Sequence, residues 1–258
     1  MANMGYTSKK KNMKRVALFC VSYESDNELE TYRQSLEKAS NKAGEKIDLD
    51  IFVAKNTKEN NPGYFGAIKK LMQNVDIKSY HYFIISNVDL TVEENFFIKL
   101  ADYNCTENIG WIAPQIWSAQ ESRDLNPKIQ SRYPYYKIRA LQFLHKHPYL
   151  HNIYSKTLYK RKRVHSSEER NIYAGHGSFI ILTKEYVEEC GIIDYPIFLF
   201  CEELYLAESC RKSNLFVKYV PNLKVYDREH VSTSHMPVKE YSYQNYNAVS
   251  YIINKFYK

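Results

Sequence analysis

The chain has 258 residues, 44% of them hydrophobic, which is enough apolar material for one large domain with a real core. No apolar run approaches the roughly 18 residues that a membrane-spanning helix needs, which argues against an integral membrane protein. The formal net charge of +7 is unevenly spread, because residues 128–170 hold 11 Lys or Arg against 2 Glu, a local +9 that leaves −2 elsewhere.

The first residues are basic and polar, and no apolar stretch precedes Val16. We therefore expect a loose basic tail over residues 1–14 rather than a secretory signal. Five cysteines are scattered without the spacing of a metal site. An odd cysteine count without a signal is typical of free thiols in a reducing compartment, so the sequence predicts a cytoplasmic protein.

Short apolar strands alternate with helical patterns along the chain. In its first half we predict strand 15–23, a helix from Ser25 through Ala39, strand 47–54, turn 61–66, helix 67–73, strand 80–86, a helix through Phe96, Phe97 and Leu100, and strand 109–116. A long irregular segment, 117–171, follows, with helical pieces around 140–147. Regularity returns with strand 178–183, helix 184–190 closed by Gly191, helix 202–213, strand 216–221 and a closing helix 241–257.

Two of the helix starts carry the spacing of a capping box, Ser25 with Glu28 and Thr91 with Glu94. The strand–helix rhythm predicts an α/β domain with a mostly parallel central sheet. Ligands of such sheets bind at the carboxyl ends of strands. Strand 80–86 ends in Asn87-Val88-Asp89, so Asp89 stands where a side chain reaches such a cleft, although a turn-forming Asp is the alternative reading.

The order of these pieces from Val16 to about Tyr257 resembles the inverting family-two glycosyltransferases, which have the GT-A fold. "VALFCVSYESDNELETYRQSL" is similar to the opening strand and helix of that family, and "NPGYFGAIKKLM" to its N-x-G turn and helix. "FIISNVDL" resembles the L-L-N-P-D form of the D-x-D motif, and "FLFCEELYLAE" the later E-D segment. "HGSF", "EELYLAE" and "EHVST" resemble a bacterial subgroup concerned with surface polysaccharides. The resemblance implies one GT-A domain over 15–258, with a variable acceptor-side region at about 118–172.

A divalent cation, Mn²⁺ or Mg²⁺, is implied by this resemblance. Asp89 matches the last residue of the metal motif, and a hard oxygen ligand suits an ion that neutralises a diphosphate. Asn87 takes the place of the first acid, so we expect it to hydrogen-bond the ribose of the nucleotide. His230 lies in the segment that resembles the family's C-terminal metal or diphosphate ligand, and Asp227 is the competing candidate.

The catalytic base implied by the resemblance is one of the pair Glu202-Glu203, of which Glu203 matches the Asp of E-D. Adjacent carboxylates raise each other's pKa in a desolvated site. Adjacent helix residues also point about 100° apart, so we expect one of the two to face the substrate. Two acids favoured at a helix N-terminus are the alternative reading, which the preceding apolar run "IFLF" weakens.

Other positions carry over as donor or acceptor contacts. Ser22, Tyr23, Lys55, Asn56 and Gly66 match positions on the nucleotide side. Lys55 replaces the acid that commonly contacts the base, so the resemblance does not imply uridine. On the acceptor or diphosphate side the matches are His176, Gly177 and Asp194, with a structural histidine and a turn-fixing Asp as the alternatives.

Basic residues interleave with tyrosines over 128–170, a composition that suits a membrane surface, a phosphate-bearing partner or single-stranded nucleic acid. A solvated basic face is the alternative. We favour the membrane and expect Arg161, Lys162 and Arg163 to bind anionic lipid or a lipid-diphosphate acceptor, with nucleic acid the least expected partner. The stripe Tyr246, Val249, Ile253 and Phe256 fits core packing or a homodimer contact.

The sequence thus predicts a metal-dependent hexosyl- or deoxyhexosyltransferase. It would move a sugar from a nucleotide-sugar to a saccharide acceptor, lipid-linked, with inversion, in cell-surface polysaccharide synthesis at the inner face of the cell membrane. The alternative is a catalytically inactive module of the same fold that binds saccharide or nucleic acid.

Overall fold

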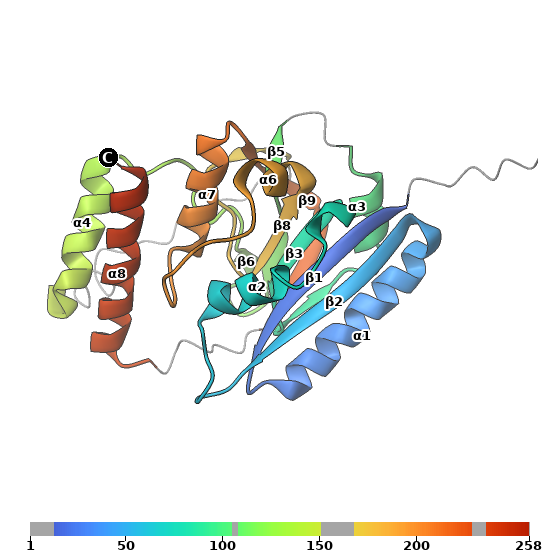
Figure 1. Cartoon of the computed structure of the whole chain (residues 1–258), viewed down its shortest axis with the longest axis horizontal. Coiled ribbons are helices and arrows are strands. Elements are labelled where there is room, and N and C mark those ends of the chain that lie inside the picture. The colour runs from blue at the N-terminus through green and yellow to red at the C-terminus, as the bar shows by residue number, and fades with distance from the viewer. Residues whose placement is uncertain (1–12, 105–107, 151–167, 229–235, 258) are drawn as a thin grey trace, which may run out of the picture.

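The computed structural model describes residues 13–104, 108–150, 168–228 and 236–257 (Figure 1). Its strands are β1 (Lys14–Tyr23), β2 (Ile47–Asn56), β3 (Tyr82–Asn87), β4 (Leu90–Val92), β5 (Ile109–Ser118), β6 (Arg123–Asp124), β7 (Arg170–Ile172), β8 (Phe179–Thr183) and β9 (Phe216–Asp227). Its helices are α1 (Asp26–Ala43), α2 (Tyr64–Met72), α3 (Phe96–Asp102), α4 (Tyr135–Lys146), α6 (Lys184–Cys190), α7 (Glu202–Lys212) and α8 (Val238–Phe256), with 3-10 turns η1 (Gly44–Lys46) and η2 (Ile77–Ser79).

One sheet runs through the molecule in the strand order β2-β1-β3-β8-β5-β9-β4, with β6 added on β5 and β7 on β9. β1 is parallel to β2 and to β3, and β5 is parallel to β9. β8 is antiparallel to both β3 and β5, so β3 and β5 point the same way on either side of it. The sheet is therefore largely parallel in direction, which confirms the predicted α/β class.

Both faces of this sheet are covered, which explains why its strands read as continuous apolar runs. Successive side chains of β1 alternate between two hydrophobic clusters: Ala17 and Phe19 belong to one, Val16 and Leu18 to the other. The second cluster includes buried side chains of α1 and α3, and the first includes those of α2, α6, α7 and α8. No helix in the described ranges is long and apolar enough to cross a membrane.

Several predicted elements are confirmed. α4 covers the helical pieces expected around 140–147, and α6 ends at Gly191, whose φ of 75° suits a glycine cap. Val249, Ile253 and Phe256 of α8 are buried in the core, and α8 packs against α4 and α7. The apolar stripe of the closing helix is thus core packing. The four described cysteines are free thiols, as expected.

Both capping-box predictions are wrong. Thr91 does not begin a helix, because Leu90–Val92 forms strand β4 and pairs with the end of β9, and α3 begins only at Phe96. Ser25 does stand at the N-cap of α1, but its hydroxyl donates a hydrogen bond to the carbonyl of Tyr23 at 2.7 Å and accepts none from the helix.

The turn before α2 depends on Gly63 rather than on Gly66. The helix begins at Tyr64, three residues earlier than predicted, so Gly66 already lies inside it. Gly63 has a φ of 82°, and a Cβ placed on it would lie 2.2 Å from the carbonyl oxygen of Phe198. A Cβ on Gly66 would meet only the Cβ of Pro62, at 3.3 Å. The close approach of two main chains therefore occurs between Gly63 and the loop that precedes α7.

We expect Gly63→Ala to lower the midpoint of thermal unfolding clearly more than Gly44→Ala. Both positions have positive φ, which costs a side chain of the order of 1–3 kcal/mol, but a Cβ on Gly44 meets nothing within 4 Å. The additional loss at Gly63 reports the contact with Phe198. Equal midpoints for the two variants, measured by circular dichroism, would contradict this contact.

Candidate active site

The expected donor contacts gather at one edge of the sheet. The parallel register places Ser22 opposite Lys55 and Tyr23 opposite Asn56, at the carboxyl ends of β1 and β2. On the other side of β1, Val21 lies opposite Asn87 at the end of β3. These residues therefore share the edge at which ligands of such sheets bind.

Side chains at this edge are held by local polar contacts. Asn56 is buried and donates to Oδ1 of Asn61 at 3.0 Å, and the same oxygen accepts from the backbone N–H of Gly63. Lys55 is exposed and pairs with Asp26 at the start of α1, with 2.7 Å between Nζ and Oδ1. Asp26 thus supplies a carboxylate beside the lysine that replaces the family's acid, which the sequence pattern did not reveal.

Asp89 lies beside the end of β9. The backbone N–H of Arg228 donates to the carbonyl of Asp89 at 3.0 Å, and the next residue, Leu90, is paired with Asp227. Oδ1 of Asp89 is buried. The fold therefore brings two candidate metal ligands, Asp89 and Asp227, to neighbouring positions on adjacent chain segments.

This pair fits the chemistry of a hard divalent cation. Carboxylate oxygens are the ligands that Mg²⁺ and Mn²⁺ prefer, and such ions keep several oxygen ligands from phosphates and water. Within the part of the chain that the structure describes, no group of three or more His, Cys, Asp or Glu is arranged to hold a metal on its own. His230 lies outside the described residues, so the choice between it and Asp227 stays a prediction.

The segment before β8 connects this edge to the acid pair. The backbone N–H of Asn87 donates to the carbonyl of Ser178 at 2.9 Å. One residue earlier, the N–H of Gly177 donates to Oε1 of Glu203 at 3.3 Å, and the hydroxyl of Tyr64 donates to the Gly177 carbonyl at 3.3 Å. A Cβ on Gly177 would lie 3.1 Å from the Glu203 carboxylate, so glycine leaves room for that approach.

The acid pair stands at a strained helix start. Phe200 and Cys201, directly before α7, both have positive φ, 73° and 62°. Two consecutive non-glycine residues in this region cost of the order of 1–3 kcal/mol each and persist only where the surroundings impose them. The hydroxyl of Tyr195 donates to the carbonyl of Phe200 at 2.6 Å and helps to hold the turn.

The two glutamates face different surroundings. Glu202 is buried near Tyr64, Tyr195 and Cys201, and its burial, together with the charge of Glu203, raises its pKa to about 8. Glu203 is half-buried and faces Gly177. The two neighbouring side chains therefore have different surroundings, because Glu202 is buried and Glu203 lies beside Gly177. Which of them faces the substrate stays a prediction.

His176 is held by hydrogen bonds through both its ring and its backbone. Its Nδ1 lies 2.8 Å from the hydroxyl of Ser178, and its backbone N–H donates to Oδ1 of Asn126 at 2.7 Å. Burial lowers its pKa well below the ordinary value, and the charges of Lys128 and Arg123 lower it further, so the ring is neutral. These contacts fit the structural alternative for His176 and leave Nε2 as the ring nitrogen that a ligand would meet.

Lys128 is a cation that the sequence reasoning did not single out. Its charge acts on His176 and also on Glu202. It follows Asn126, whose amide donates to the carbonyl of Pro114 at 2.7 Å. Only the fold reveals this lysine, because its partners are at least 48 residues away in the sequence (176 − 128 = 48).

Asp194 contacts none of these residues in the hydrogen bonds and ion pairs described for it, which join it to Lys69 and Tyr205. Its carboxylate pairs with Lys69 of α2, with 2.6 Å between Oδ1 and Nζ, and its backbone N–H donates to the hydroxyl of Tyr205 at 3.2 Å. The pair with Lys69 lowers the pKa of Asp194. These contacts fit the turn-fixing alternative better than contact with an acceptor.

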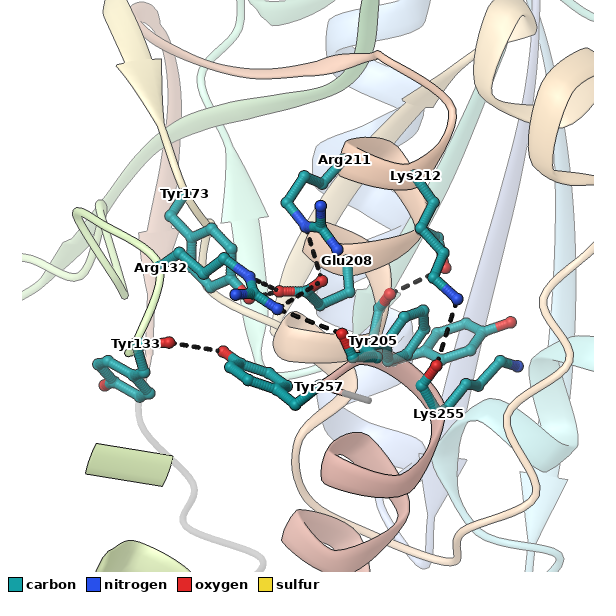
Figure 2. A network of polar contacts seen from close by, with 11 residues as sticks. Arg132, Tyr133, Tyr173, Tyr205, Glu208, Arg211, Lys212, Lys255 and Tyr257 are labelled. Atoms are coloured by element: carbon teal, nitrogen blue, oxygen red, sulfur yellow. Dashed lines mark hydrogen bonds and ion pairs between the residues drawn. The ribbon is translucent and has the colours of Figure 1, made fainter. Parts of the chain in front are cut away.

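The helix that bears the acid pair is anchored further along its length by Glu208 (Figure 2). Oε1 of this fully buried carboxylate accepts from Arg132 Nε at 2.5 Å and from the Tyr173 hydroxyl at 2.7 Å, and Oε2 accepts from Arg211 Nε at 2.8 Å. Arg132 also stacks on the ring of Tyr257, 3.9 Å from its centroid. This network fixes α7 against the end of α8 and the segment before α4.

No family model and no curated protein sequence matches this chain. Among solved structures it is similar to a mutant of Drosophila β-1,4-galactosyltransferase 7 in complex with manganese, UDP-Gal and xylobiose, with 14% identity, a TM-score of 0.48, and coverage of 81% of this chain and 66% of that one. It is also similar to GalNAc-T7 in complex with UDP, GalNAc and Mn²⁺, with 12% identity, a TM-score of 0.55, and coverage of 96% of this chain.

The chain spans 66% and 57% of the lengths of these two proteins. At such identities the likeness concerns the fold alone, and the likeness to GalNAc-T7 confirms the predicted GT-A fold.

We expect Glu202→Gln to change the pH dependence of stability. The pKa of a glutamate in the unfolded chain is about 4.3, and that of Glu202 in the folded chain is about 8. Between these pH values the folded chain therefore binds more protons than the unfolded chain. The contribution of Glu202 is therefore fully present below about pH 4.3 and is lost as the pH rises through about 8. Glutamine removes this loss.

Thermal unfolding of wild type and variant between pH 5 and pH 8.5 measures the effect. The gain in midpoint on replacing Glu202 by Gln should be larger at the high end of this range. Glu37→Gln, on the exposed side of α1, is the control and should leave the profile unchanged. A Glu202→Gln gain that does not vary with pH would refute the raised pKa.

Proposed function

We infer that this chain is a metal-dependent glycosyltransferase that moves a sugar from a nucleotide-sugar to a saccharide acceptor with inversion at the anomeric carbon. The observation that carries the proposal is the placement of the Glu203 carboxylate. This carboxylate lies at the strained start of α7 and accepts a hydrogen bond from the backbone N–H of Gly177. The next residue, Ser178, accepts a hydrogen bond from Asn87 at the end of β3. The fold of GalNAc-T7, solved with UDP, GalNAc and Mn²⁺, supports a nucleotide-sugar donor of the same class.

Glu203 acts as the base in this proposal. Its carboxylate accepts the proton of the acceptor hydroxyl while the hydroxyl oxygen forms a bond to the anomeric carbon and the bond from that carbon to the diphosphate breaks. Attack from the face opposite the departing diphosphate inverts the configuration. Glu202 is less suited to this role because its side chain is buried, whereas Glu203 faces Gly177.

The donor lies along the carboxyl edge of β1, β2 and β3 in this proposal. Ser22, Tyr23, Lys55 and Asn56 contact the nucleotide, and Asn87 hydrogen-bonds the ribose. Asp89 holds the divalent cation with Asp227 or His230, and the bound cation supplies Lewis-acid stabilisation of the diphosphate charge. Lys128, which acts electrostatically on His176 and Glu202, adds a positive charge on the same side.

The proposed acceptor is a lipid-linked saccharide in cell-surface polysaccharide synthesis, at the cytoplasmic face of the membrane. This rests on the resemblance of "EELYLAE" to the polysaccharide subgroup and on the local charge of residues 128–170. Arg161, Lys162 and Arg163, the expected contacts to lipid diphosphate, lie outside the described residues.

Glu203→Gln should lower kcat by about 10²–10⁴-fold, the usual contribution of a positioned base, because the amide cannot take a proton at neutral pH. Donor affinity should change little, since the base contacts the acceptor. Rates at saturating donor and acceptor, with donors chosen from a panel of nucleotide-sugars, measure this. Glu202→Gln is the matched control and should reduce kcat less. A larger loss in Glu202→Gln would reverse the roles, and wild-type rates in both would refute the acid pair as the source of the base.

Asp89→Ala should abolish the part of nucleotide-diphosphate binding that depends on Mn²⁺ while the fold stays intact. Calorimetric titration with and without Mn²⁺, alongside thermal unfolding, separates a lost ligand from a lost fold. Asp194→Ala is the control, because its carboxylate pairs with Lys69 at the surface. Metal-independent binding in the wild type would favour the alternative of an inactive binding module.

A further inference from the structure

Helix α4 exposes a concentration of aromatic side chains. The described part of the chain leaves twelve large hydrophobic side chains exposed, and five of these lie on α4 or directly after it: Tyr135, Tyr136, Phe143, Tyr149 and Leu150. Tyr136 and Tyr149 are 76% and 87% exposed. Large apolar side chains that gather on one exposed element, rather than being scattered singly, mark an interaction surface.

Basic side chains share this exposed surface. Tyr136, Arg139, Phe143 and Lys146 follow one another at intervals of three or four residues, so they form one stripe along the helix, which we call the α4 face. The opposite side of the helix packs inward: Gln142 donates to the hydroxyl of Ser250 at 2.7 Å, and Ile138 is fully buried. The α4 face is therefore left to solvent while the helix is firmly held.

The charge on this surface has one sign. The sequence contains no Asp or Glu between Asp124 and Glu168, and Lys137 adds a third exposed cation beside the α4 face. The acid nearest along α8 is Glu240, in its first turn, and Lys239 precedes it. A surface of this composition is complementary to an anionic one.

We propose that the α4 face docks on an anionic phospholipid bilayer. Tyrosine and phenylalanine suit the interface between headgroups and acyl chains, and lysine and arginine meet the lipid phosphates. A second copy of the chain fits less well, because two such faces would bring like charges together. A single nucleic-acid strand needs a groove, whereas α4 lies at one end of the molecule, with α8 between it and α7 (Figure 1).

Ring contacts connect the end of α4 to the loop that precedes the acid pair. Tyr241 of α8 packs on His145 at the end of α4, with 6.3 Å between ring centroids, and on Phe200, with 5.0 Å. Phe200 stands two residues before Glu202. His145, which precedes Lys146 of the α4 face, is thus connected through Tyr241 to the loop that precedes the proposed base. Delivery of a lipid-borne acceptor rests on the proposed function, but docking itself does not.

The test is cosedimentation of the intact chain with vesicles of phosphatidylcholine alone or mixed with phosphatidylglycerol, with no donor or acceptor present. The chain should bind the anionic vesicles more tightly, and salt should weaken this binding. Arg139→Ala/Lys146→Ala should weaken it about thirtyfold, because each basic side chain near an anionic surface contributes about fivefold. Lys70→Ala/Lys78→Ala removes the same charge from exposed positions on other elements and should have little effect.

Aromatic anchoring is tested separately with Phe143→Ala, expected to weaken binding about tenfold, against Phe216→Ala on β9, which is similarly exposed and should bind like the wild type. Equal loss in the α4 and control variants, or equal binding to neutral and anionic vesicles, would overturn the proposal. The proposal would also be overturned if the wild type did not bind vesicles but formed dimers that the Phe143→Ala substitution dissociates. Because no catalytic step is measured, failure here leaves the proposed activity to its own tests.

Discussion

The ion-pair network around Glu208 is the interaction on which the site depends most directly. A carboxylate with no solvent contact is costly unless it is paired and fully hydrogen-bonded. Burial alone would raise the pKa of Glu208, but the hydrogen bonds from Arg132, Tyr173 and Arg211 outweigh it and hold the pKa below its usual value. Glu208 is thus ionised and fixes the middle of α7 to two other segments, through Arg132 and Tyr173, while Arg211 belongs to α7 itself. With α7 fixed there, its first turn can hold the strained backbone of Phe200 and Cys201.

Two buried glutamates of α7, Glu202 and Glu208, have opposite protonation states. Both are buried, so their different partners account for the difference between their pKa values. Glu208 has two guanidinium groups within hydrogen-bonding distance, whereas Glu202 has mainly tyrosines, a thiol and another carboxylate nearby. The ionised glutamate stabilises the scaffold. Glu202 lies beside Glu203, and its burial together with the charge of Glu203 raises its pKa, whereas Glu203 is the residue that faces Gly177.

The sequence revealed the sheet and its functional edge better than the details of the site. Buried strands such as β1 and β3 are short apolar runs, so their ends, and Asn87 and Asp89 with them, could be located from the pattern alone. Strand β4 could not, because Leu90–Val92 becomes a strand only through pairing with β9, more than 130 residues later (225 − 92 = 133). Nor could the glycine at the turn before α2 be identified, since the positive φ of Gly63 and the close approach of Phe198 to it arise only in the folded chain.

The donor and acceptor sides of the proposed site are held in place by different kinds of contact. On the donor side, parallel strand register fixes the positions of Ser22, Asn56 and Asn87 through backbone hydrogen bonds, which tolerate little change. On the acceptor side, the loop before α7 meets α8 through the ring contacts of Phe200 with Tyr241 and of Tyr195 with Tyr251, and Tyr241 in turn packs on His145 of α4. Side-chain contacts between helices can be altered one residue at a time without shifting the sheet. Under the proposed function, the acceptor side can therefore change while the edge proposed to bind the nucleotide stays the same.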